Sequence, residues 1–334
     1  MIRKNISLKK YNSFNIDVNA KEFVEVNSKD ELIEIANKTK DKNVLYLGGG
    51  SNILFTRDFD GVVIHLNIKG IQCEKTNSDE TVVKANAGEN WNYFVEFCIE
   101  NDLGGIENLS MIPGNVGSAP VQNIGAYGVE LKDVFLSCEV FNKNDFSIKT
   151  YNLEDCKFEY RNSIFKENKN LIILSIRLKL KNKNHKINST YGGINDELKK
   201  LKISKPKIKD ISNVVCSIRK RKLPDPKKIG NAGSFFKNPV VKKDKLEWIK
   251  KYFNDVPSYK LDDNNYKIPA AWLIESAGLK GKELDGFGIH KTQPLVLVNY
   301  GGAKGEDIYK LSLSVKEIIF KIFKIELETE VNII

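Results

Sequence analysis

The stretch from Pro113 to Gly128 is the feature that most restricts what this chain can fold into. Its sixteen residues include no charged side chain, although the protein contains 53 Lys and Arg residues and 43 Asp and Glu residues. Four glycines, two alanines and a serine leave the backbone almost bare, so that its N–H groups can approach an anionic ligand closely. A tight turn does not need so many uncharged residues, and the stretch therefore favours a loop that binds phosphate.

A second glycine-rich run follows the apolar segment Val44–Leu47 and reads Gly-Gly-Gly-Ser-Asn over residues 48–52. Taken alone, this run is equally typical of a tight turn. Neither run is a P-loop, because no Gly-Lys-Ser/Thr follows the glycines, and neither has the spacing of a dinucleotide-binding βαβ unit. Together they predict a ligand with two or more phosphates, bound by something other than a Rossmann domain or a P-loop NTPase.

Length and composition indicate two or three ordered domains, because 334 residues with 41% hydrophobic content can form buried cores. Residues Met1–Tyr11 are polar and basic, which predicts no signal peptide, and no apolar run approaches the length of a membrane span. The five cysteines include no Cys-x-x-Cys pair, and the three histidines are scattered. We therefore expect reduced cysteines, no metal site and a cytoplasmic location.

The formal net charge of +10 raises the question of a nucleic-acid partner, because it concentrates in Lys179–Lys186, Lys199–Lys209 and Arg219–Lys222. No aromatic residue is interleaved in these runs, and no helix-turn-helix, zinc-finger or RNA-binding pattern is present. The pattern favours a solvated basic surface, which can also attract phosphate-bearing small molecules. No nucleic-acid partner and no membrane partner are expected.

The periodicity of the sequence predicts an α+β protein. Ser28 begins a capping box that ends at Glu31, and Asn90 is positioned to cap a second helix with apolar residues at helical spacing. Strands are expected at residues 44–47, 62–64, 134–141 and 171–180, the last because apolar and polar residues alternate.

The second half of the chain follows a rigid break at Leu223–Lys227, which is a candidate domain boundary. A short helix is expected from Pro269 to Ala277, and a strand from Pro294 to Asn299. A long helix is expected over residues 306–323, and the alternating tail Ile325–Val331 predicts a final strand. The apolar face expected for the long helix consists of Ile308, Leu311, Val315, Ile318 and Ile322.

Three further positions are candidates for chemistry. Ser234 follows a glycine and precedes two phenylalanines, an arrangement that permits close approach and excludes water, but it does not form a Gly-x-Ser-x-Gly nucleophile elbow. Arg161 lies in the neutral run Tyr160–Ser163 and can hold a carboxylate. Glu330 lies on the polar face of the tail. On pattern alone, a turn or a solvated surface is the commoner interpretation of each of the three.

Taken together, these segments resemble the UDP-N-acetylenolpyruvoylglucosamine reductases of peptidoglycan synthesis, nearly from end to end. The one departure from the family pattern is Thr329, where proline is usual between the two glutamates. An extended backbone accepts either residue, so we expect Glu330 to keep its direction. The resemblance is carried by Asn12–Phe14, Gly48–Asn52, Ala87–Trp91, Ile112–Gly128, Tyr160–Phe165, Lys222–Lys227, Gly230–Pro239 and Leu327–Val331.

The resemblance implies the two-subdomain FAD-binding fold of vanillyl-alcohol oxidase-like flavoenzymes, followed by a C-terminal α+β substrate domain. The implied domains are residues 1–69 with 324–334, residues 70–222, and residues 223–323 for the UDP-sugar. The two glycine-rich runs become parts of one FAD site. Its implied cofactor-binding residues are Gly48, Gly49, Gly50, Ser51, Asn52, Pro113, Gly114, Gly117, Ser118, Gln122, Asn123, Gly125, Ala126, Tyr127 and Gly128.

In the resembled family, NADPH reduces the flavin, and a hydride then passes to the terminal carbon of the enolpyruvyl group. Negative charge develops on the neighbouring carbon and its carboxylate, where preorganised donors lower the barrier. Arg161 and Glu330 match the residues for this task, and burial that raised the pKa of Glu330 would keep it a donor. Ser234 matches the residue that protonates the carbanion, with Lys222, Lys237 or a water left open as its helper.

The resemblance also implies contacts with the substrate or the nicotinamide. Tyr259 lies in the polar stretch Asp255–Lys267 and resembles the tyrosine-bearing loop of the long subclass, which closes over the UDP group. A purely structural role stays open for each of these positions. The implied substrate-binding residues are Tyr191, Lys222, Asn238, Tyr259, Lys280 and Gln293.

Two other functions remain open from the sequence. A flavin oxidase of the same superfamily accounts for the FAD loops but not for the Ser234 segment or Glu330. A basic nucleic-acid-binding protein accounts only for the net charge. The favoured prediction is a cytoplasmic, monomeric reductase that uses FAD and NADPH.

Overall fold

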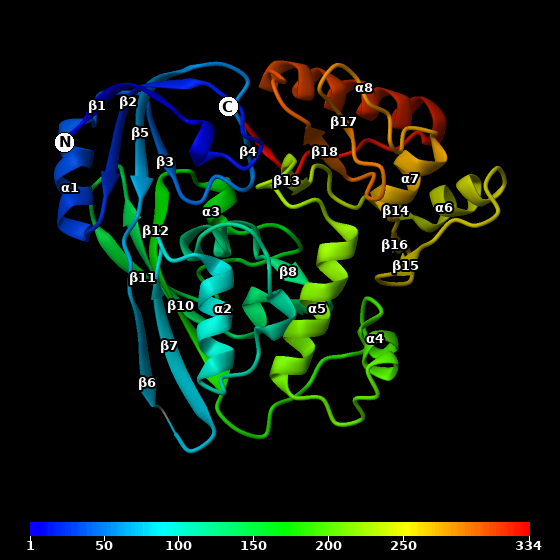
Figure 1. Cartoon of the computed structure of the whole chain (residues 1–334), viewed down its shortest axis with the longest axis horizontal. Helices are drawn as coiled ribbons and strands as arrows, with labels where there is room; N and C mark the ends of the chain where they lie inside the picture. Colours follow the sequence, from blue (N-terminus) through cyan, green and yellow to red (C-terminus); the bar gives the residue numbers. More distant parts are fainter. Residues whose placement is uncertain (76) are drawn as a thin grey trace. The chain divides into compact units, whose positions relative to one another are not determined.

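The computed structural model describes residues 1–75 and 77–334, which divide into two compact units. Unit 1 comprises residues 1–6, 20–49 and 60–219, and unit 2 comprises residues 7–19, 50–59 and 220–334. Each unit therefore combines segments that are distant in the sequence (Figure 1). The three-domain division expected from the sequence stays a prediction.

The first sheet of unit 1 has the strand order β1-β2-β5-β3, in which β3 runs parallel to β5. Helix α1 buries Leu32 and Ala36 against this sheet. The Ser28 hydroxyl accepts the Glu31 N–H, as predicted, whereas the Glu31 carboxylate accepts from the N–H of Asn27 instead of Ser28. The elements are β1 (Arg3–Ser7), β2 (Asn19–Val26), α1 (Lys29–Lys38), β3 (Val44–Leu47) and β5 (Phe59–Leu66).

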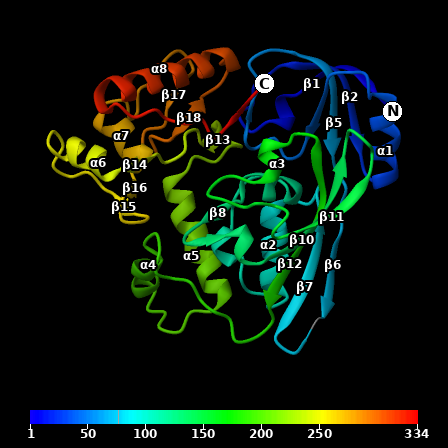
Figure 2. The same ribbon diagram turned by 180° about the vertical axis from the view of Figure 1, so that it is seen from behind.

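The second sheet of unit 1 is antiparallel, with the order β11-β10-β12-β7-β6 (Figure 2). Helix α2 (Trp91–Glu100) packs Trp91, Phe94, Val95 and Cys98 into the core of this sheet. The Asn90 side chain caps the helix by accepting the N–H of Tyr93, as predicted. The strands are β6 (Ile71–Lys75), β7 (Glu80–Asn86), β10 (Phe135–Asn142), β11 (Ile148–Asn152) and β12 (Leu171–Lys181).

Helices α4 (Ile194–Lys200) and α5 (Ile208–Lys222) form a smaller apolar cluster in unit 1, against which Tyr127 packs. The buried hydroxyls of Ser110 and Ser212 lie 2.8 Å apart and join α5 to the chain just before the uncharged stretch. Helix α5 is therefore anchored to the region that the sequence assigns to the cofactor.

Unit 2 is built on two three-stranded antiparallel sheets with the orders β13-β18-β17 and β14-β16-β15. A short parallel pair joins β19 to β4. The strands are β4 (Ile53–Leu54), β13 (Gly230–Ser234), β14 (Val240–Lys242), β15 (Tyr259–Lys260), β16 (Asn265–Lys267), β17 (Phe287–Ile289), β18 (Val296–Asn299) and β19 (Asn332–Ile333), and the helices are α6 (Lys243–Lys250), α7 (Ala270–Ser276) and α8 (Gly305–Phe323).

The buried face of α8 differs from the predicted one. Ile308 and Val315 are buried as expected, but the last two turns bury Ile319 and Phe323, and Ile322 is exposed. The Phe323 ring centroid lies 4.9 Å from that of Phe253 and 5.8 Å from that of Trp272. These aromatic contacts determine which of two apolar faces turns inward.

The tail is less regular than the predicted strand. Ile325, Leu327 and Val331 are buried in alternation with polar residues. The backbone nevertheless forms only a single bridge, between Thr329 and Phe236, before the two-residue strand β19. The alternation of apolar and polar residues thus predicts correctly which side chains are buried, but the segment does not pair along its length as a β-strand.

In the chain apart from residue 76, none of the helices combines the length and the apolar character needed to cross a bilayer.

Candidate active site

Gly49 and Gly114 bring the two glycine-rich runs together in unit 1. A Cβ on Gly49 would lie 2.9 Å from the Cα of Gly114 and 2.8 Å from the Oδ1 of Asn115, closer than real Cβ atoms approach. Gly48 is less restricted, because its Cβ would lie 3.9 Å from Ser118. The bare backbones therefore meet in a cradle that any larger side chain at position 49 would disturb.

The rest of the uncharged stretch is held by backbone hydrogen bonds to the segment around α2. The N–H of Gly117 donates to Ala87 O and that of Val116 donates to Glu89 O, while Gly114 O accepts from the N–H of Trp91. Two short 3-10 turns contain Ser118 and Gln122, and a hairpin of two-residue strands contains Gly125 and Ala126. These elements are Val116–Ser118, Pro120–Gln122, β8 (Gly125–Ala126) and β9 (Val129–Glu130).

Asn123 and Arg161 meet at this stretch. The buried Asn123 amide donates to Glu130 and to the Glu159 carbonyl and accepts the Lys132 N–H, so its side chain supports the loop. The Arg161 guanidinium donates to the carbonyl oxygens of Gly125 at 2.5 Å and Asn123 at 3.4 Å. The amide hydrogen bonds of Asn123 lie within the protein, and its assignment to the cofactor stays a prediction.

Arg161 occupies a special backbone conformation. It lies in a tight two-residue turn between Glu159 and Asn162, with a φ of 53°, which non-glycine residues rarely adopt. Its guanidinium carbon lies 5.2 Å from the centroid of the Tyr160 ring. A Cβ on Gly125 would approach Arg161 Nη1 to 2.9 Å, so the glycine leaves the space that the guanidinium fills.

Tyr127 and Gly128 end the stretch in left-handed conformations, with φ values of 50° and 79°. Asn108 Nδ2 donates to the Tyr127 carbonyl, and the Tyr127 ring packs against Gly192, where a Cβ would come within 2.5 Å of it. Burial raises the pKa of the Tyr127 phenol. Tyr191, a predicted substrate residue, lies beside Gly128 and is about half exposed.

The 48–52 run continues from unit 1 into unit 2 at Gly50. A Cβ on Gly50 would lie 1.9 Å from the Tyr11 carbonyl oxygen, and the residue has a φ of 60°, so only glycine fits. Further along, Asn52 Nδ2 donates to the Glu330 carbonyl oxygen at 3.2 Å. A residue predicted to bind cofactor therefore also positions a predicted catalytic residue.

Ser234 stands at a β-bulge of β13, opposite Val296 of β18. The bulge begins at Asn231, whose Oδ1 accepts the Gly233 N–H at 2.9 Å, and Gly233 takes a φ of 71° with open space where a Cβ would lie. The two following residues, Phe235 and Phe236, are fully buried. Ser234 therefore lies at the bulge, between the turn that Asn231 holds and the buried rings of Phe235 and Phe236.

Glu330 is held against the same segment. Its N–H donates to the Phe235 carbonyl at 2.8 Å, and the Lys237 N–H donates to the Glu328 carbonyl at 2.9 Å. These two bonds flank the bridge between Phe236 and Thr329. The structure therefore brings the backbones of Ser234 and Glu330 together in unit 2, while Arg161 belongs to unit 1.

The two lysines proposed to help Ser234 differ in their surroundings. Lys237 forms an ion pair with Glu328, with Nζ 2.8 Å from the carboxylate. Lys222 is exposed at the last residue of α5. The ion pair ties Lys237 to the tail, which favours a structural role for it.

The remaining predicted substrate residues lie in unit 2. Asn238 Oδ1 accepts the N–H of Ala270 at the start of α7, and Lys280 forms an exposed ion pair with Glu275. Gln293 precedes β18 and accepts the Val296 N–H through its carbonyl. Tyr259 lies in β15 of the small sheet and is about half exposed.

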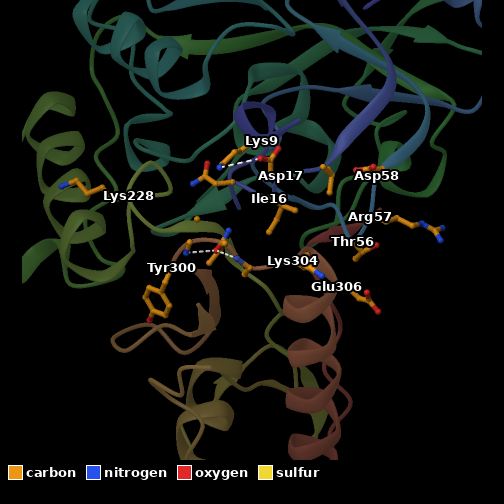
Figure 3. Close-up of a pocket in the computed structure, with 18 residues that line it drawn as sticks. Lys9, Ile16, Asp17, Thr56, Arg57, Asp58, Lys228, Tyr300, Lys304 and Glu306 are labelled. Carbon is orange, nitrogen blue, oxygen red and sulfur yellow. Dashed lines mark hydrogen bonds and ion pairs between the residues drawn. The ribbon is translucent and has the colours of Figure 1, made fainter. Parts of the chain in front are cut away.

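One hollow of unit 2 is separate from all of these residues (Figure 3). It has a volume of about 420 Å³, and none of the predicted site residues lines it. Lys9 and Asp17 form a weak ion pair at its rim, 3.9 Å apart. Other charged residues around it are Arg57, Asp58, Lys228, Lys304 and Glu306.

Sequence reasoning missed Asn231 as a determinant of the Ser234 geometry. Its Nδ2 donates to the Ile229 carbonyl at 2.8 Å and to the Pro224 carbonyl at 3.3 Å, while its Oδ1 holds the bulge. The Asn-Ala-Gly spacing is a signal that could have found it, because asparagine commonly hydrogen-bonds the backbone two residues on.

Comparison with known proteins agrees with this arrangement. A family model described as "FAD binding domain" matches residues 20–148, and one described as "UDP-N-acetylenolpyruvoylglucosamine reductase, C-terminal domain" matches residues 225–334. The UDP-N-acetylenolpyruvoylglucosamine reductase of Flavobacterium johnsoniae is 49% identical, covering 100% of this chain and 99% of its own length. That of Amoebophilus asiaticus is 45% identical, with the same coverage.

This chain belongs to the UDP-N-acetylenolpyruvoylglucosamine reductase family. A crystal structure of the Thermus caldophilus reductase has a TM-score of 0.70 and 24% identity, and the match covers 100% of this chain and 99% of that one. The predicted fold class, a two-subdomain FAD-binding fold with a C-terminal α+β domain, is confirmed, as is the predicted FAD cofactor. The assignment to the long subclass with a tyrosine loop stays a prediction.

Proposed function

We propose that this protein is the NADPH-dependent, FAD-mediated reductase that converts the enolpyruvyl group of UDP-N-acetylglucosamine enolpyruvate into UDP-N-acetylmuramate for peptidoglycan synthesis. The observation that carries the proposal is the backbone hydrogen bond between Glu330 and Phe235, which holds the terminal glutamate beside the Ser234 bulge. It links the two segments that distinguish this family from other flavoenzymes, in a chain 49% identical to a curated family member over its full length.

Gly49 packs directly against Gly114, which brings two bare backbones together in a cradle, and the N–H groups of such backbones can hold a pyrophosphate. Residues 48–52 and 113–128 would hold the FAD there. When bound, FAD supplies the redox chemistry, by accepting a hydride from NADPH and delivering it to the terminal carbon of the enolpyruvyl group. The protein's own residues then have two tasks, which are to stabilise the resulting negative charge and to deliver one proton.

Arg161 is suited to the first task. Its guanidinium is fixed by two carbonyl oxygens of the cofactor stretch and by the Tyr160 ring, so little conformational entropy is lost when it binds a carboxylate. Glu330 would share this task in its protonated form, as the donor of a hydrogen bond that strengthens as negative charge develops. A donor preorganised in this way typically changes the rate by about 10²–10³-fold.

Ser234 is suited to the second task. Its hydroxyl would give its proton to the carbon next to the carboxylate, so that one hydride and one proton together saturate the double bond. The bulge at Asn231 and the buried Phe235 and Phe236 fix its position and exclude water from one side. A serine is a weak acid, and Lys222 or a bound water is the candidate that restores its proton.

The test separates the two half-reactions. Wild type and a Ser234→Ala variant are reduced with NADPH, and the enolpyruvyl UDP-sugar is then added while flavin absorbance is followed. The variant's flavin should be reduced at the normal rate, whereas its reoxidation by substrate should nearly stop. Unchanged turnover would remove Ser234 from the mechanism. A flavin oxidase would instead consume oxygen and form peroxide, so measuring peroxide tests that alternative.

The proposal extends to the other predicted features. Tyr259 would close over the UDP group as in the long subclass, with Tyr191, Asn238, Lys280 and Gln293 contacting the substrate or the nicotinamide. Residues 1–69 with 324–334, 70–222 and 223–323 would act as three domains. We also propose that the enzyme is a cytoplasmic monomer without nucleic-acid or membrane partners, and that the net charge of +10 reflects a solvated surface.

A further inference from the structure

Asn12 belongs to a motif that carries the family resemblance, but none of the roles above uses it. It lies in a loop of unit 2 that is closed where the Leu8 N–H donates to the Val18 carbonyl at 2.7 Å. The Asn12 side chain is buried. Its Nδ2 donates to the Leu8 carbonyl at 2.8 Å and to the Ile16 carbonyl at 2.9 Å, while its Oδ1 accepts the Ile16 N–H at 3.0 Å. One amide group therefore holds the two halves of the loop together.

The backbone next to Asn12 joins two segments of the candidate site. The Ser13 N–H donates to the Gly50 carbonyl at 3.0 Å, and the Ser13 carbonyl accepts the Asn231 N–H at 2.9 Å. Gly50 belongs to the second glycine-rich run, and Asn231 begins the bulge that carries Ser234. The loop that Asn12 holds is therefore hydrogen-bonded to a predicted cofactor segment on one side and to the proton-donor segment on the other.

Phe14 packs the same loop against β13 and β18. Its carbonyl accepts Asn299 Nδ2 at 2.8 Å, and a Cβ on Gly230 would lie 2.2 Å from that carbonyl oxygen. The buried Phe14 ring meets the Phe235 ring edge to face, with the two centroids 6.3 Å apart. Contacts as close as these leave neither side room to adjust alone. A change in the shape of the loop is therefore transmitted to the strand that carries Ser234.

We propose that Asn12 is a positioning residue for the proton transfer from Ser234. The inference rests on the function proposed above, in which the Ser234 hydroxyl must reach a carbon of the substrate. Asn12 acts through the backbones of Ser13 and Asn231. Loss of its amide removes three hydrogen bonds from the buried Leu8 and Ile16, so the loop and the bulge lose their fixed geometry. A displacement of about 1 Å at a reacting group can slow the chemical step about 10²-fold.

The experiment compares Asn12→Ala with Val315→Ala in single turnovers of the holoenzyme. Val315 is buried in α8 and is no part of the loop, so its truncation controls for a general loss of stability. Each protein is reduced with NADPH and then mixed with the enolpyruvyl UDP-sugar, and stopped-flow absorbance gives a rate constant per bound flavin for each step. We expect Asn12→Ala to be reduced at the wild-type rate but reoxidised about tenfold or more slowly. Val315→Ala should keep both wild-type rate constants.

The solvent isotope effect on reoxidation tests the proton transfer itself. If Ser234 is displaced, donation of its proton limits the rate, so the ratio of the rate constants in H₂O and D₂O should be larger in Asn12→Ala than in wild type. Partial unfolding lowers the amplitude of the absorbance change and leaves the rate constant unaltered. A variant that loses amplitude alone would therefore show a merely structural role and overturn the proposal.

Asn12→Ser applies if the alanine variant does not fold, because a hydroxyl keeps one donor and one acceptor at this position. Its reoxidation should also be slower than that of wild type, with unchanged reduction by NADPH. Wild-type reoxidation kinetics in either folded variant would overturn the proposal, and so would equal slowing of both steps or equal slowing in Val315→Ala. Wild type that is reduced by NADPH and reoxidised by the UDP-sugar keeps the proposed function intact in each of these cases.

Discussion

The backbone N–H of Glu330 donates to the carbonyl oxygen of Phe235 at 2.8 Å, although the two residues are far apart in the sequence. Asn52 holds the other side of the same residue through the Glu330 carbonyl. Glu330 is thus fixed between the segment that carries Ser234 and a loop predicted to bind FAD. Both hydrogen bonds use the backbone of Glu330, so a substitution of its side chain leaves them intact.

Replacing Glu330 with alanine should therefore affect the chemistry without unfolding the site. We expect flavin reduction by NADPH to be unchanged, whereas flavin reoxidation by the enolpyruvyl substrate slows by about 10²–10³-fold, because a positioned donor to the developing charge is lost. Stopped-flow absorbance measures both steps. Glu328→Ala is the matched control, since it removes an exposed carboxylate that pairs with Lys237 and should turn over at close to the wild-type rate.

Thr329→Pro should be tolerated. The hydrogen bonds beside the Phe236–Thr329 bridge are donated by Lys237 and Glu330, so a proline at position 329 removes no ladder bond. We expect the free energy of unfolding in urea to change by less than about 1 kcal/mol. Lys237→Pro removes a ladder donor and should cost about 1–3 kcal/mol, because the Glu328 carbonyl loses its hydrogen bond. Equal losses in the two variants would contradict this account of the bridge.

Gly49→Ala should destabilise the apoprotein by about 1–3 kcal/mol, because its methyl group would overlap the backbone of Gly114 and the side chain of Asn115. Gly48→Ala is the matched control, since its methyl group meets only ordinary contacts with Ser118. Urea denaturation of the two apoproteins, without FAD, measures the difference. A Gly49→Ala apoprotein as stable as Gly48→Ala would show that the two runs are not packed as described.

Glu139 should make the stability of unit 1 depend on pH. Burial alone would raise its pKa, but hydrogen bonds from Lys29, Lys84 and Ser175 outweigh this and lower the pKa to about 2. Because the folded-state pKa is depressed, the stabilisation is present above the unfolded value near 4.5 and is lost as pH falls toward 2. We expect Glu139→Gln to cost about 1–2 kcal/mol at pH 7, after allowing for solvent screening.

Urea denaturation of Glu139→Gln at several pH values tests this directly. The difference from wild type should be constant between pH 6 and 8 and should shrink below about pH 4.5. Glu74→Gln removes an exposed carboxylate from the same sheet and should show almost no difference at any pH. A pH-independent cost of Glu139→Gln would mean that its packing, and not its charge, provides the stabilisation.

The sequence predicted local structure well where the signal is local. The Asn90 cap of α2 and the strand at 44–47 are confirmed, because a capping side chain or a short apolar run acts within a few residues. The buried face of α8 was predicted wrongly in its last two turns. Both candidate faces there are apolar, and contacts of Phe323 with Phe253 and Trp272 decide between them.

The candidate active site shows the same difference between local sequence signals and long-range contacts. Residue types by themselves predicted a phosphate-bearing ligand at a bare, uncharged backbone, and the resemblance carried by the motifs identified the family. Only the tertiary structure decided that Gly49 meets Gly114, that Asn231 forms the bulge before Ser234, and that Phe235 holds Glu330. These are long-range contacts or backbone conformations, and their energies depend on atoms that the neighbouring sequence does not specify.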